Sequence, residues 1–284
     1  MAQLKIALVV IVYGKTLQQS LTIQDLLKFK YPLHQLLIVN NGPEAILEHD
    51  SCIQDLGQIH QNVTLQNQLQ NKPLSWIYND FIQSYDADYY VLFDDDTEIN
   101  EQYQDVLFHL KNVDFELPEI RARCDLKPRF PMMNSQLLQH RGEIIEPEKI
   151  YSVGSGLIIS HRIKEFFKDK NMEIFDSNFA FYGVDTTFFT RINQFIKQGY
   201  KFKFSSMTYL NHCLSLTEES LTTWRKNEFI YENVLTLKYY SSSQWSKNLK
   251  FIKLVFRKII KLSFRDAFLI IKVFFKGKHP RCEI

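Results

Sequence analysis

The chain has 284 residues, of which 45% are hydrophobic, 23% are charged and 14% are aromatic. This is the composition of a globular protein, long enough for one large domain or for a domain with an appendage. The four cysteines, Cys52, Cys124, Cys213 and Cys282, lie far apart and form no CxxC pair. We therefore expect neither a zinc site nor a disulfide framework, and a reducing compartment.

The net charge of +2 conceals an uneven distribution. Residues 245–284 contain 11 Lys/Arg and only two acidic residues, so this tail carries +9 and the rest of the chain −7. Basic tails on acidic bodies often contact anionic surfaces. No apolar run approaches the length of a transmembrane helix, and the first run, 6–12, is typical of a strand rather than a secretion signal. We expect a cytoplasmic protein.

Strand-like and helix-like segments alternate along the first hundred residues. The expected strands span 5–12, 36–39, 63–66 and 89–93; the expected helices follow a Thr16-x-x-Gln19 capping box and then span 44–56 and 74–85. Asn40-Asn41-Gly42-Pro43 is a turn. This β-α-β rhythm predicts an α/β fold with a parallel sheet and helices on its faces.

The second half of the chain is less regular at first. Residues 115–150 contain four prolines and are expected to be loops that cover or shape a site. Order resumes at 153–159, and the remaining expectations are a helix opening at Phe181-Tyr182-Gly183-Val184-Asp185 and reaching 197, a strand at 201–210 and a helix at 217–240.

Three consecutive carboxylates, Asp94, Asp95 and Asp96, follow the apolar strand. Each close pair repels by roughly 1 kcal/mol or more near a protein surface. A divalent cation such as Mg²⁺ or Mn²⁺ commonly offsets such repulsion, and the carboxyl ends of parallel strands are where α/β sheets bind ligands. The alternative is a solvated acidic loop without a ligand.

Four features recur in one order: the strand ending at Tyr13-Gly14, the Ile38-Val39-Asn40-Asn41-Gly42 segment, Asp94-Asp95-Asp96-Thr97, and Gly183-Val184-Asp185 before a helix. Together, over about residues 5–240, they resemble the family-2 glycosyltransferases of the GT-A fold, particularly the bacterial rhamnosyltransferase-like branch. The resemblance makes the acidic strand end a DxD motif. It implies that Asp94 contacts the ribose or the metal's hydration shell, and that Asp96 coordinates a Mn²⁺ or Mg²⁺ ion bridging the donor diphosphate.

The resemblance also implies a donor site, to which Asp94 and Asp95 contribute. Its nucleotide-binding segments match Val12-Tyr13-Gly14 and Asn40-Asn41, and Asn79 lies where the family carries an asparagine. The family usually has an aspartate at the Asn40-Asn41 position, so the departure leaves the nucleotide open. The alternatives are a tight turn for Asn41-Gly42, and helix capping or surface polarity for Asn79.

Asp185 resembles the second residue of the family's ED motif, the catalytic base; the first residue is Val184 here. A positioned carboxylate can take the proton of an acceptor hydroxyl group. The alternative is an ordinary N-cap, and Asp176 is a rival base.

Four further assignments follow from the resemblance. His212 would be the third metal ligand, against the alternative of a satisfied core or surface histidine. Gly154-Ser155-Gly156 matches an acceptor-side glycine segment, against the alternative of a β-bulge. Trp224 and Arg225, on the helix after His212, are also assigned to the acceptor side, where they could approach the diphosphate; the alternative is a surface helix.

The tail has basic residues at three- and four-residue steps with interleaved apolar ones, from Lys250 to Arg265. This is the periodicity of a basic amphipathic helix on a membrane interface. We expect residues 1–240 to form the GT-A domain and 241–284 a helical tail that holds the protein at the inner face of the cell membrane. The alternative is a helix pair packed on the catalytic domain or across a dimer.

The combined prediction is an inverting, metal-dependent glycosyltransferase. Its donor would be a UDP- or dTDP-sugar and its acceptor a hydroxyl group of a glycan, lipid-linked, in the synthesis of a capsule, O-antigen or similar surface polysaccharide. A non-catalytic metal- or sugar-binding protein with a degenerate site is the alternative. A haloacid-dehalogenase-type phosphotransferase is disfavoured by the spacing of Thr97 from Asp94 and by the internal strand. A nucleic-acid role for the tail lacks a supporting motif.

Overall fold

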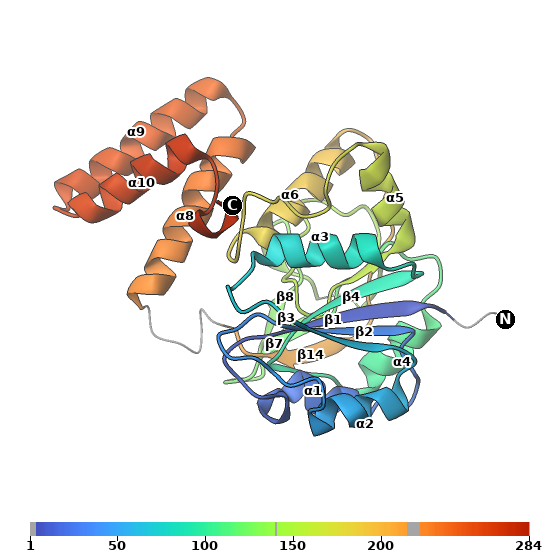
Figure 1. Cartoon of the computed structure of the whole chain (residues 1–284). Helices are drawn as coiled ribbons and strands as arrows, with labels where there is room; N and C mark the ends of the chain where they lie inside the picture. Colours follow the sequence, from blue (N-terminus) through green and yellow to red (C-terminus); the bar gives the residue numbers. More distant parts are fainter. Residues whose placement is uncertain (1–3, 140, 215–221, 284) are drawn as a thin grey trace.

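The structure, a computed structural model, describes residues 4–139, 141–214 and 222–283. Within these ranges the chain forms a central sheet flanked by helices, a smaller sheet at one end, and a helical C-terminal part that stands out to one side (Figure 1). The predicted α/β fold with a C-terminal helical extension is therefore confirmed.

The central sheet has eight strands in the order β11-β13-β6-β12-β4-β1-β2-β3. The four strands of its first half are parallel, as predicted: β1 Ile6–Val12, β2 Gln35–Asn40, β3 Val63–Asn67 and β4 Tyr89–Asp94. The other half adds β6 Phe115–Glu116, β11 Gly142–Ile144, β12 Ile158–Ser160 and β13 Phe204–Ser206. Here β12 runs antiparallel to both β4 and β6, so the sheet is mixed rather than wholly parallel.

Helices cover both faces of this sheet (Figure 1). One face carries α1 Leu21–Leu26, α2 Ser51–Ile59 and α4 Glu101–His109; the other carries α3 Leu74–Ser84, α5 His161–Asp169 and α6 Val184–Lys197. Alternate residues of β1 enter the two cores, Val9 on one side and Val10 on the other. Because both of their faces are buried, β1, β2 and β4 are continuous apolar runs, the pattern from which they were predicted.

Two expected helices in the first half begin later than the sequence pattern indicated. The Thr16 capping box is present, but it opens a 3₁₀ turn, Leu17–Gln19, and α1 follows with Ser20 as its cap. The helix expected at 44–56 is wrong in its first part. Asp50 caps α2. In the loop before it, the side-chain amide of Asn67 accepts a hydrogen bond from Ile46 N and donates one to Ile46 O.

The segment 115–150 is not irregular. Besides β6 and β11 it contains β7 Glu119–Ala122, β8 Pro128–Phe130, β9 Met132–Met133 and β10 Gln136–Leu137. The single strand expected at 201–210 is also wrong. It is two strands in different sheets, β13 and then β14 Tyr209–His212. The buried Glu116 carboxylate breaks the strand by accepting hydrogen bonds from Met207 N and Thr208 Oγ1.

Strand β14 belongs to a four-stranded sheet in the order β5-β14-β7-β8, where β5 is Thr97–Glu98. It pairs antiparallel with β5, so that His212 lies opposite Thr97. This pairing brings the end of the 201–212 segment to the carboxylates at the end of β4.

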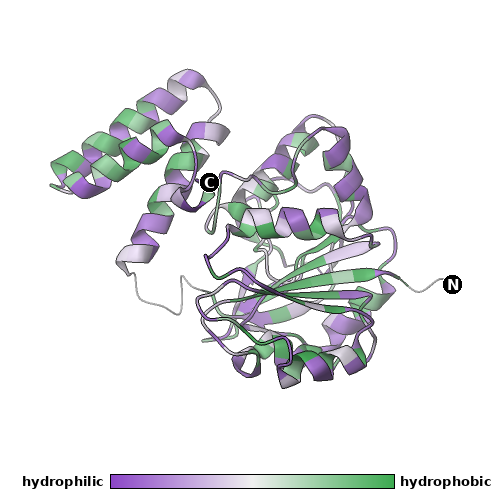
Figure 2. Ribbon diagram, viewed as in Figure 1, coloured by the Kyte–Doolittle hydropathy of each residue, from purple (hydrophilic) through white to green (hydrophobic). Residues whose placement is uncertain are grey.

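The C-terminal part consists of α8 Thr223–Tyr240, α9 Gln244–Ile260, α10 Phe264–Lys276 and the 3₁₀ turn η2 Pro280–Cys282. The helix expected from 217 begins at 223 within the described residues; 215–221 lie outside them. Helices α9 and α10 form a hairpin away from the sheet (Figure 1), and Figure 2 shows that hydrophobic and hydrophilic residues alternate along both helices. None of the helices described is both long and apolar enough to span a membrane.

Candidate active site

The three consecutive carboxylates form a rigid turn at the carboxyl end of β4. Two hydroxyl groups at the start of α1 bond the backbone of this turn. Thr22 Oγ1 donates to Asp94 O over 2.6 Å, and Ser20 Oγ donates to Asp95 O over 2.8 Å. Two short hydroxyl side chains at the start of a helix therefore position the acidic turn.

Asp95 faces away from its two neighbours. Its carboxylate accepts a hydrogen bond from Tyr13 N at 3.1 Å and pairs with Lys15 Nζ at 2.5 Å. Burial raises the pKa of Asp95, and the bond and charge of Lys15 oppose that rise. The middle acid thus fixes the loop after β1, and Lys15 offsets part of the repulsion among the three acids.

Asp94 and Asp96 meet at His212. Asp94 Oδ2 lies 3.7 Å from His212 Nε2, and Asp96 Oδ1 lies 3.1 Å from His212 Nδ1. One ligand atom from each of the three residues lies within 4.8 Å of the others. The structure therefore brings together the three residues that the sequence analysis proposed as metal ligands.

A buried hydroxyl pair supports this cluster. Thr97 Oγ1 lies 2.9 Å from His212 Nδ1 and 2.7 Å from Ser155 Oγ, and Asp94 N donates to Ser155 Oγ over 3.1 Å. Ligating histidines commonly have such a partner on the second ring nitrogen, which sets the ring's orientation. Ser155 thus supports the acidic turn, and its acceptor-side role stays a prediction.

The cluster fits a hard divalent cation. Asp96 Oδ1 is buried and lies 3.1 Å from His212 Nδ1. Burial raises the pKa of Asp94 to about 7. The charge of Asp96 adds to this rise, and His212 opposes it. Burial acts the same way on Asp96, but the bond to His212 and its charge hold the pKa of Asp96 below its usual value. Two carboxylates and a histidine form a mixed ligand set that can hold Mn²⁺ or Mg²⁺.

The loops after β1 and β2 lie side by side. Asn41 N donates to Val12 O, and Gly14 N donates to Gly42 O, both over 2.8 Å. Gly42 has a φ of +99°, and a Cβ there would stand 2.9 Å from a backbone oxygen, so the turn requires glycine. Tyr13 projects from this surface with 52% of its side chain exposed.

The asparagines proposed for the donor site differ in what their side chains do. Asn40 bonds Glu44 O, Asn67 and Gly42 N, and Asn79 bonds the backbone of Phe175 with both ends of its amide. These two side chains are occupied within the fold.

Asn41 also uses its amide nitrogen within the fold, donating to Lys72 O and to Asn71 Oδ1. Its Oδ1, however, is buried without a hydrogen-bond partner in the described part of the chain. Asn41 is therefore the one asparagine of the three with a polar atom left for a ligand.

Asp185 lies in the first turn of α6, and its cap is Gly183 with a φ of +90°. The alternative that Asp185 is the N-cap is therefore wrong. Its Oδ1 accepts from Thr186 N at 2.7 Å. Burial raises the pKa of Asp185, opposed by hydrogen bonds from the backbone of Thr186, Asp185 and Gly154. The Asp185 charge in turn contributes to the raised pKa of Asp94, which places both carboxylates in one electrostatic cluster.

The remaining predicted residues divide by burial. A Cβ on Gly156 would stand 2.2 Å from a methyl carbon of Leu210, whereas Gly154 faces open space. Trp224 is half-exposed on α8, with its ring 5.5 Å from that of Phe181, and Arg225 is buried. The rival base Asp176 accepts a hydrogen bond from the Tyr240 hydroxyl group and caps its own loop, which accounts for it structurally.

Sequence reasoning missed three residues of this region: Lys15, Thr97 as a partner of His212, and Glu232, which reaches Asp185 through Thr186. Thr97 and Lys15 lie beside motifs and could have been found from that proximity. Glu232 had no signal in the sequence, because it lies mid-helix and 47 positions from Asp185.

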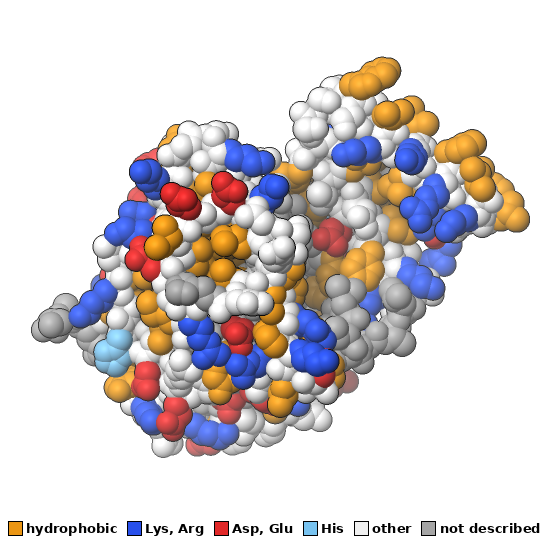
Figure 3. Space-filling view, turned by 180° about the vertical axis from the view of Figure 1, so that it is seen from behind, with side chains coloured by type: hydrophobic (Ala, Val, Ile, Leu, Met, Phe, Trp, Pro, Cys, Tyr) orange, Lys and Arg blue, Asp and Glu red, His pale blue; other side chains and the backbone are white. Residues whose placement is uncertain are grey.

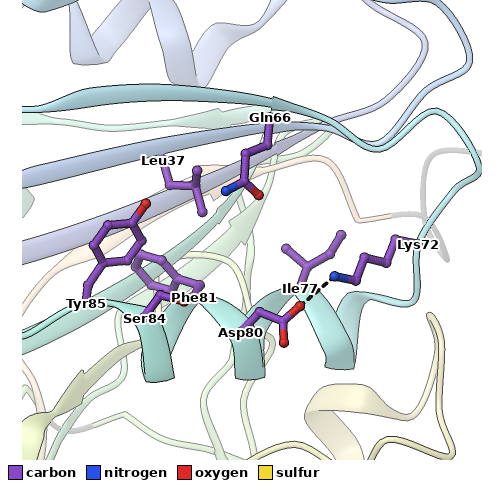
Figure 4. A pocket seen from close by; sticks show the side chains of 8 residues that line it. All are labelled: Leu37, Gln66, Lys72, Ile77, Asp80, Phe81, Ser84 and Tyr85. Atoms are coloured by element: carbon purple, nitrogen blue, oxygen red, sulfur yellow. Dashed lines mark hydrogen bonds and ion pairs between the residues drawn. The ribbon is translucent and has the colours of Figure 1, made fainter.

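A small cavity of about 40 Å³ lies elsewhere, between α3 and the sheet (Figure 4). Lys72 and Asp80 form an ion pair on one side of it, and Phe81 and Tyr85 line the other side. None of the clustered carboxylates lines it, so this cavity is not the candidate site.

No family model and no curated protein matches this sequence. Solved structures do match. S. aureus TarS aligns with a TM-score of 0.54 and 13% identity over 86% of this chain and 41% of TarS. The chain has the fold of TarS. At this identity the likeness establishes the fold alone, and it confirms the GT-A type of α/β fold predicted from the motifs.

Two structures of TarS residues 1–349 match in the same way. The fragment in complex with UDP aligns with a TM-score of 0.52 and 13% identity over 85% of this chain and 68% of the fragment. The fragment in complex with UDP-GlcNAc aligns with a TM-score of 0.50 and 13% identity over 85% of this chain and 69% of the fragment. TarS is thus a protein that binds UDP-GlcNAc. The rhamnosyltransferase-like branch stays an expectation.

Proposed function

We propose that this protein is a metal-dependent glycosyltransferase that moves a sugar from a nucleoside-diphosphate sugar to a hydroxyl group, with inversion at the anomeric carbon. The observation that carries this proposal is the convergence of Asp94, Asp96 and His212 at the end of β4, in a chain with the TarS fold. Asp185, in electrostatic contact with that cluster, adds the base that the reaction needs.

Asp94, Asp96 and His212 would hold Mn²⁺ or Mg²⁺, which supplies positive charge to a departing diphosphate. Val12, Tyr13 and Gly14 would carry the nucleotide, because Asp95 and Lys15 hold this loop next to the acidic turn. Asn41, with its unpartnered Oδ1, would accept a hydrogen bond from the base. The TarS complexes with UDP and UDP-GlcNAc favour a uridine nucleotide over dTDP.

Asp185 would act as the base. Its carboxylate takes the acceptor's hydroxyl proton while that oxygen bonds to the anomeric carbon and the diphosphate leaves with the bonding electrons. Gly154 offers open space beside this carboxylate, where an acceptor can approach. Trp224, half-exposed on α8, would contact that acceptor. The acceptor would be a glycan, lipid-linked, of a surface polysaccharide such as a capsule or O-antigen.

The test is turnover of UDP-GlcNAc, followed as release of UDP with Mn²⁺, Mg²⁺ or EDTA. We expect metal-dependent release by the natural protein, and a loss of roughly 100-fold or more in Asp96→Ala and Asp185→Asn. Asp86→Asn, a substitution of a carboxylate that is 80% exposed, is the matched control and keeps full activity. Undiminished turnover in Asp96→Ala and Asp185→Asn would contradict the assignment.

We further propose that residues 241–284 rest on an anionic membrane surface, with residues 1–240 as the catalytic domain at the cytoplasmic face. Helix α9 is 17 residues long and contains no buried residue. Hydrophobic side chains and Lys/Arg alternate over the hairpin (Figure 3). An apolar depression of about 270 Å³ on it is lined by Phe251, Ile252, Val255, Phe256, Ile259, Ile271 and Phe275.

Charge complementarity supports this partner, since each Lys/Arg near anionic lipid contributes about 1 kcal/mol. We expect the protein to co-sediment with vesicles containing phosphatidylglycerol and weakly with pure phosphatidylcholine. Combined Phe256→Ser and Phe268→Ser, at residues 61% and 68% exposed, should abolish pelleting, whereas Ile145→Ser, at a residue 79% exposed outside the hairpin, should not. Equal pelleting of all forms would rule out the hairpin as the contact.

A further inference from the structure

A second carboxylate faces the same hydroxyl group as Asp185. Thr186 Oγ1 donates to Glu232 Oε1 over 3.2 Å and lies 3.5 Å from Asp185 Oδ1. Glu232 comes from α8, whereas Asp185 and Thr186 belong to the first turn of α6. The Thr186 hydroxyl group therefore stands between two carboxylates from separate helices.

Close packing sets this arrangement. A Cβ on Gly183 would stand 2.5 Å from the Phe179 ring and 3.2 Å from Glu232 Cγ, so the start of α6 requires glycine and α8 packs closely against it. Next to this contact, the rings of Tyr182 and Phe229 stack with centroids 4.5 Å apart. Glu232 is thus held at a fixed distance from Thr186 rather than placed by a flexible loop.

The surroundings of the pair contain no cation. Among the described residues neither carboxylate forms an ion pair. The other titratable groups near them are Tyr151, whose hydroxyl group lies 3.4 Å from Thr186 Oγ1, and Tyr78 and Asp94, on which the charge of Asp185 acts. Burial raises the pKa of Glu232 to about 7, with the charge of Asp185 as the second cause. Burial also raises the pKa of Asp185. Two carboxyl groups bridged by one hydroxyl group are placed to exchange a proton.

We propose that Glu232 is the final proton acceptor of the reaction, receiving through the hydroxyl group of Thr186 the proton that Asp185 takes from the acceptor. The inference rests on the proposed glycosyltransferase function and extends it. When the acceptor oxygen bonds to the anomeric carbon and the diphosphate leaves, Asp185 becomes protonated. Asp185 then gives that proton to Thr186 Oγ1 while the hydroxyl proton of Thr186 moves to Glu232 Oε1, so Asp185 regains its charge and no other reagent is needed.

Glu232 acts through Asp185 and is a positioning residue, so its test needs a readout that a purely structural role leaves unchanged. The pH dependence of kcat provides one, measured as release of UDP from UDP-GlcNAc with Mn²⁺ and water as the acceptor. In the natural protein we expect kcat to fall below about pH 7. In Glu232→Gln we expect kcat at pH 8 to fall roughly tenfold and the acid limb to move to lower pH, because a negative charge beside Asp185 is gone.

Thr186→Val and Thr186→Ser separate the relay from packing. Valine keeps the shape but removes the hydroxyl group, so we expect a loss close to that of Glu232→Gln, with an unchanged KM for the donor. Serine keeps the hydroxyl group and should stay within twofold of the natural rate. Melting temperature and Mn²⁺ binding, measured for each variant, check folding, and the valine and serine pair decides the question if Glu232→Gln does not fold.

Equal rates for Thr186→Val and Thr186→Ser, or a natural pH profile in a folded Glu232→Gln, would overturn the relay while leaving the glycosyltransferase proposal intact. A natural protein that turns over no nucleotide sugar would overturn both. A loss confined to the KM of the donor would also refute the relay, because proton transfer follows donor binding.

Discussion

Replacing Thr97 with valine probes the cluster of Asp94, Asp96 and His212 without touching a proposed ligand. Thr97 is fully buried, and its Oγ1 lies 2.9 Å from His212 Nδ1 and 2.7 Å from Ser155 Oγ. Valine fills the same volume but offers no hydroxyl group, so two buried polar atoms lose a partner. Asp96 Oδ1, 3.1 Å from the same ring nitrogen, is then the nearest acceptor for it.

The expected magnitude has two parts. Loss of the group that orients a ligating histidine typically lowers metal affinity by about 10- to 100-fold, equivalent to about 1.4–2.8 kcal/mol of binding free energy. The unpaired polar atoms left in the interior should lower the free energy of unfolding by roughly 1–3 kcal/mol. Withdrawal of Asp96 toward the imidazole would add to the loss of affinity.

Calorimetric titration with Mn²⁺ measures the first part and urea denaturation the second. Thr97→Ser is the matched control, because it keeps the hydroxyl group at the cost of one methyl group. We expect serine to bind Mn²⁺ like the natural protein and valine to bind it at least tenfold more weakly. Equal Mn²⁺ affinity in the two variants would refute the view that Thr97 orients His212 for a cation.

Three further predictions concern other parts of the fold. Gly156→Ala should lower the free energy of unfolding, measured by urea denaturation, by at least about 2 kcal/mol. The φ of Gly156 is +80°, and a Cβ there would overlap the Leu210 side chain. Gly154→Ala, at a position facing open space, should be nearly neutral in the same assay. Burial lowers the pKa of His60 to about 4, below its unfolded value, so its neutral form stabilises the fold above about pH 6.5 and that contribution is lost as the pH falls toward 4. Between pH 7 and 5 this amounts to about 2 kcal/mol, which His60→Gln should remove from the pH dependence of unfolding; an unchanged slope would contradict the assignment. Arg281→Ala removes the hydrogen bond from the C-terminal turn to Asn71, whose side chain also accepts from Asn41 of the proposed donor site. We expect the KM for UDP-GlcNAc to rise several-fold with little change in kcat. An unchanged KM would argue against a role of Arg281 in donor binding.

Local patterns sufficed for the framework of the first half. Continuous apolar runs identified β1, β2 and β4, because strands buried on both faces carry no polar alternation. The acidic turn was predicted to be a ligand site because the carboxyl ends of parallel strands meet at one edge of a sheet. The boundaries of α2 and the break between β13 and β14 were not predictable, because they depend on side chains such as Asn67 and Glu116 that act over long sequence distances.

The sequence by itself therefore determined the class of fold, the strand that carries the carboxylates and the residues able to bind a cation. Only the tertiary structure decided how those residues are used. Asp95 turns away to Lys15, the pairing of β14 with β5 brings His212 to Asp96, and close packing of α8 on α6 adds Glu232 to Asp185. The physical reason is that strand identity follows from burial along a few neighbouring residues, whereas these contacts depend on which distant segments pack together.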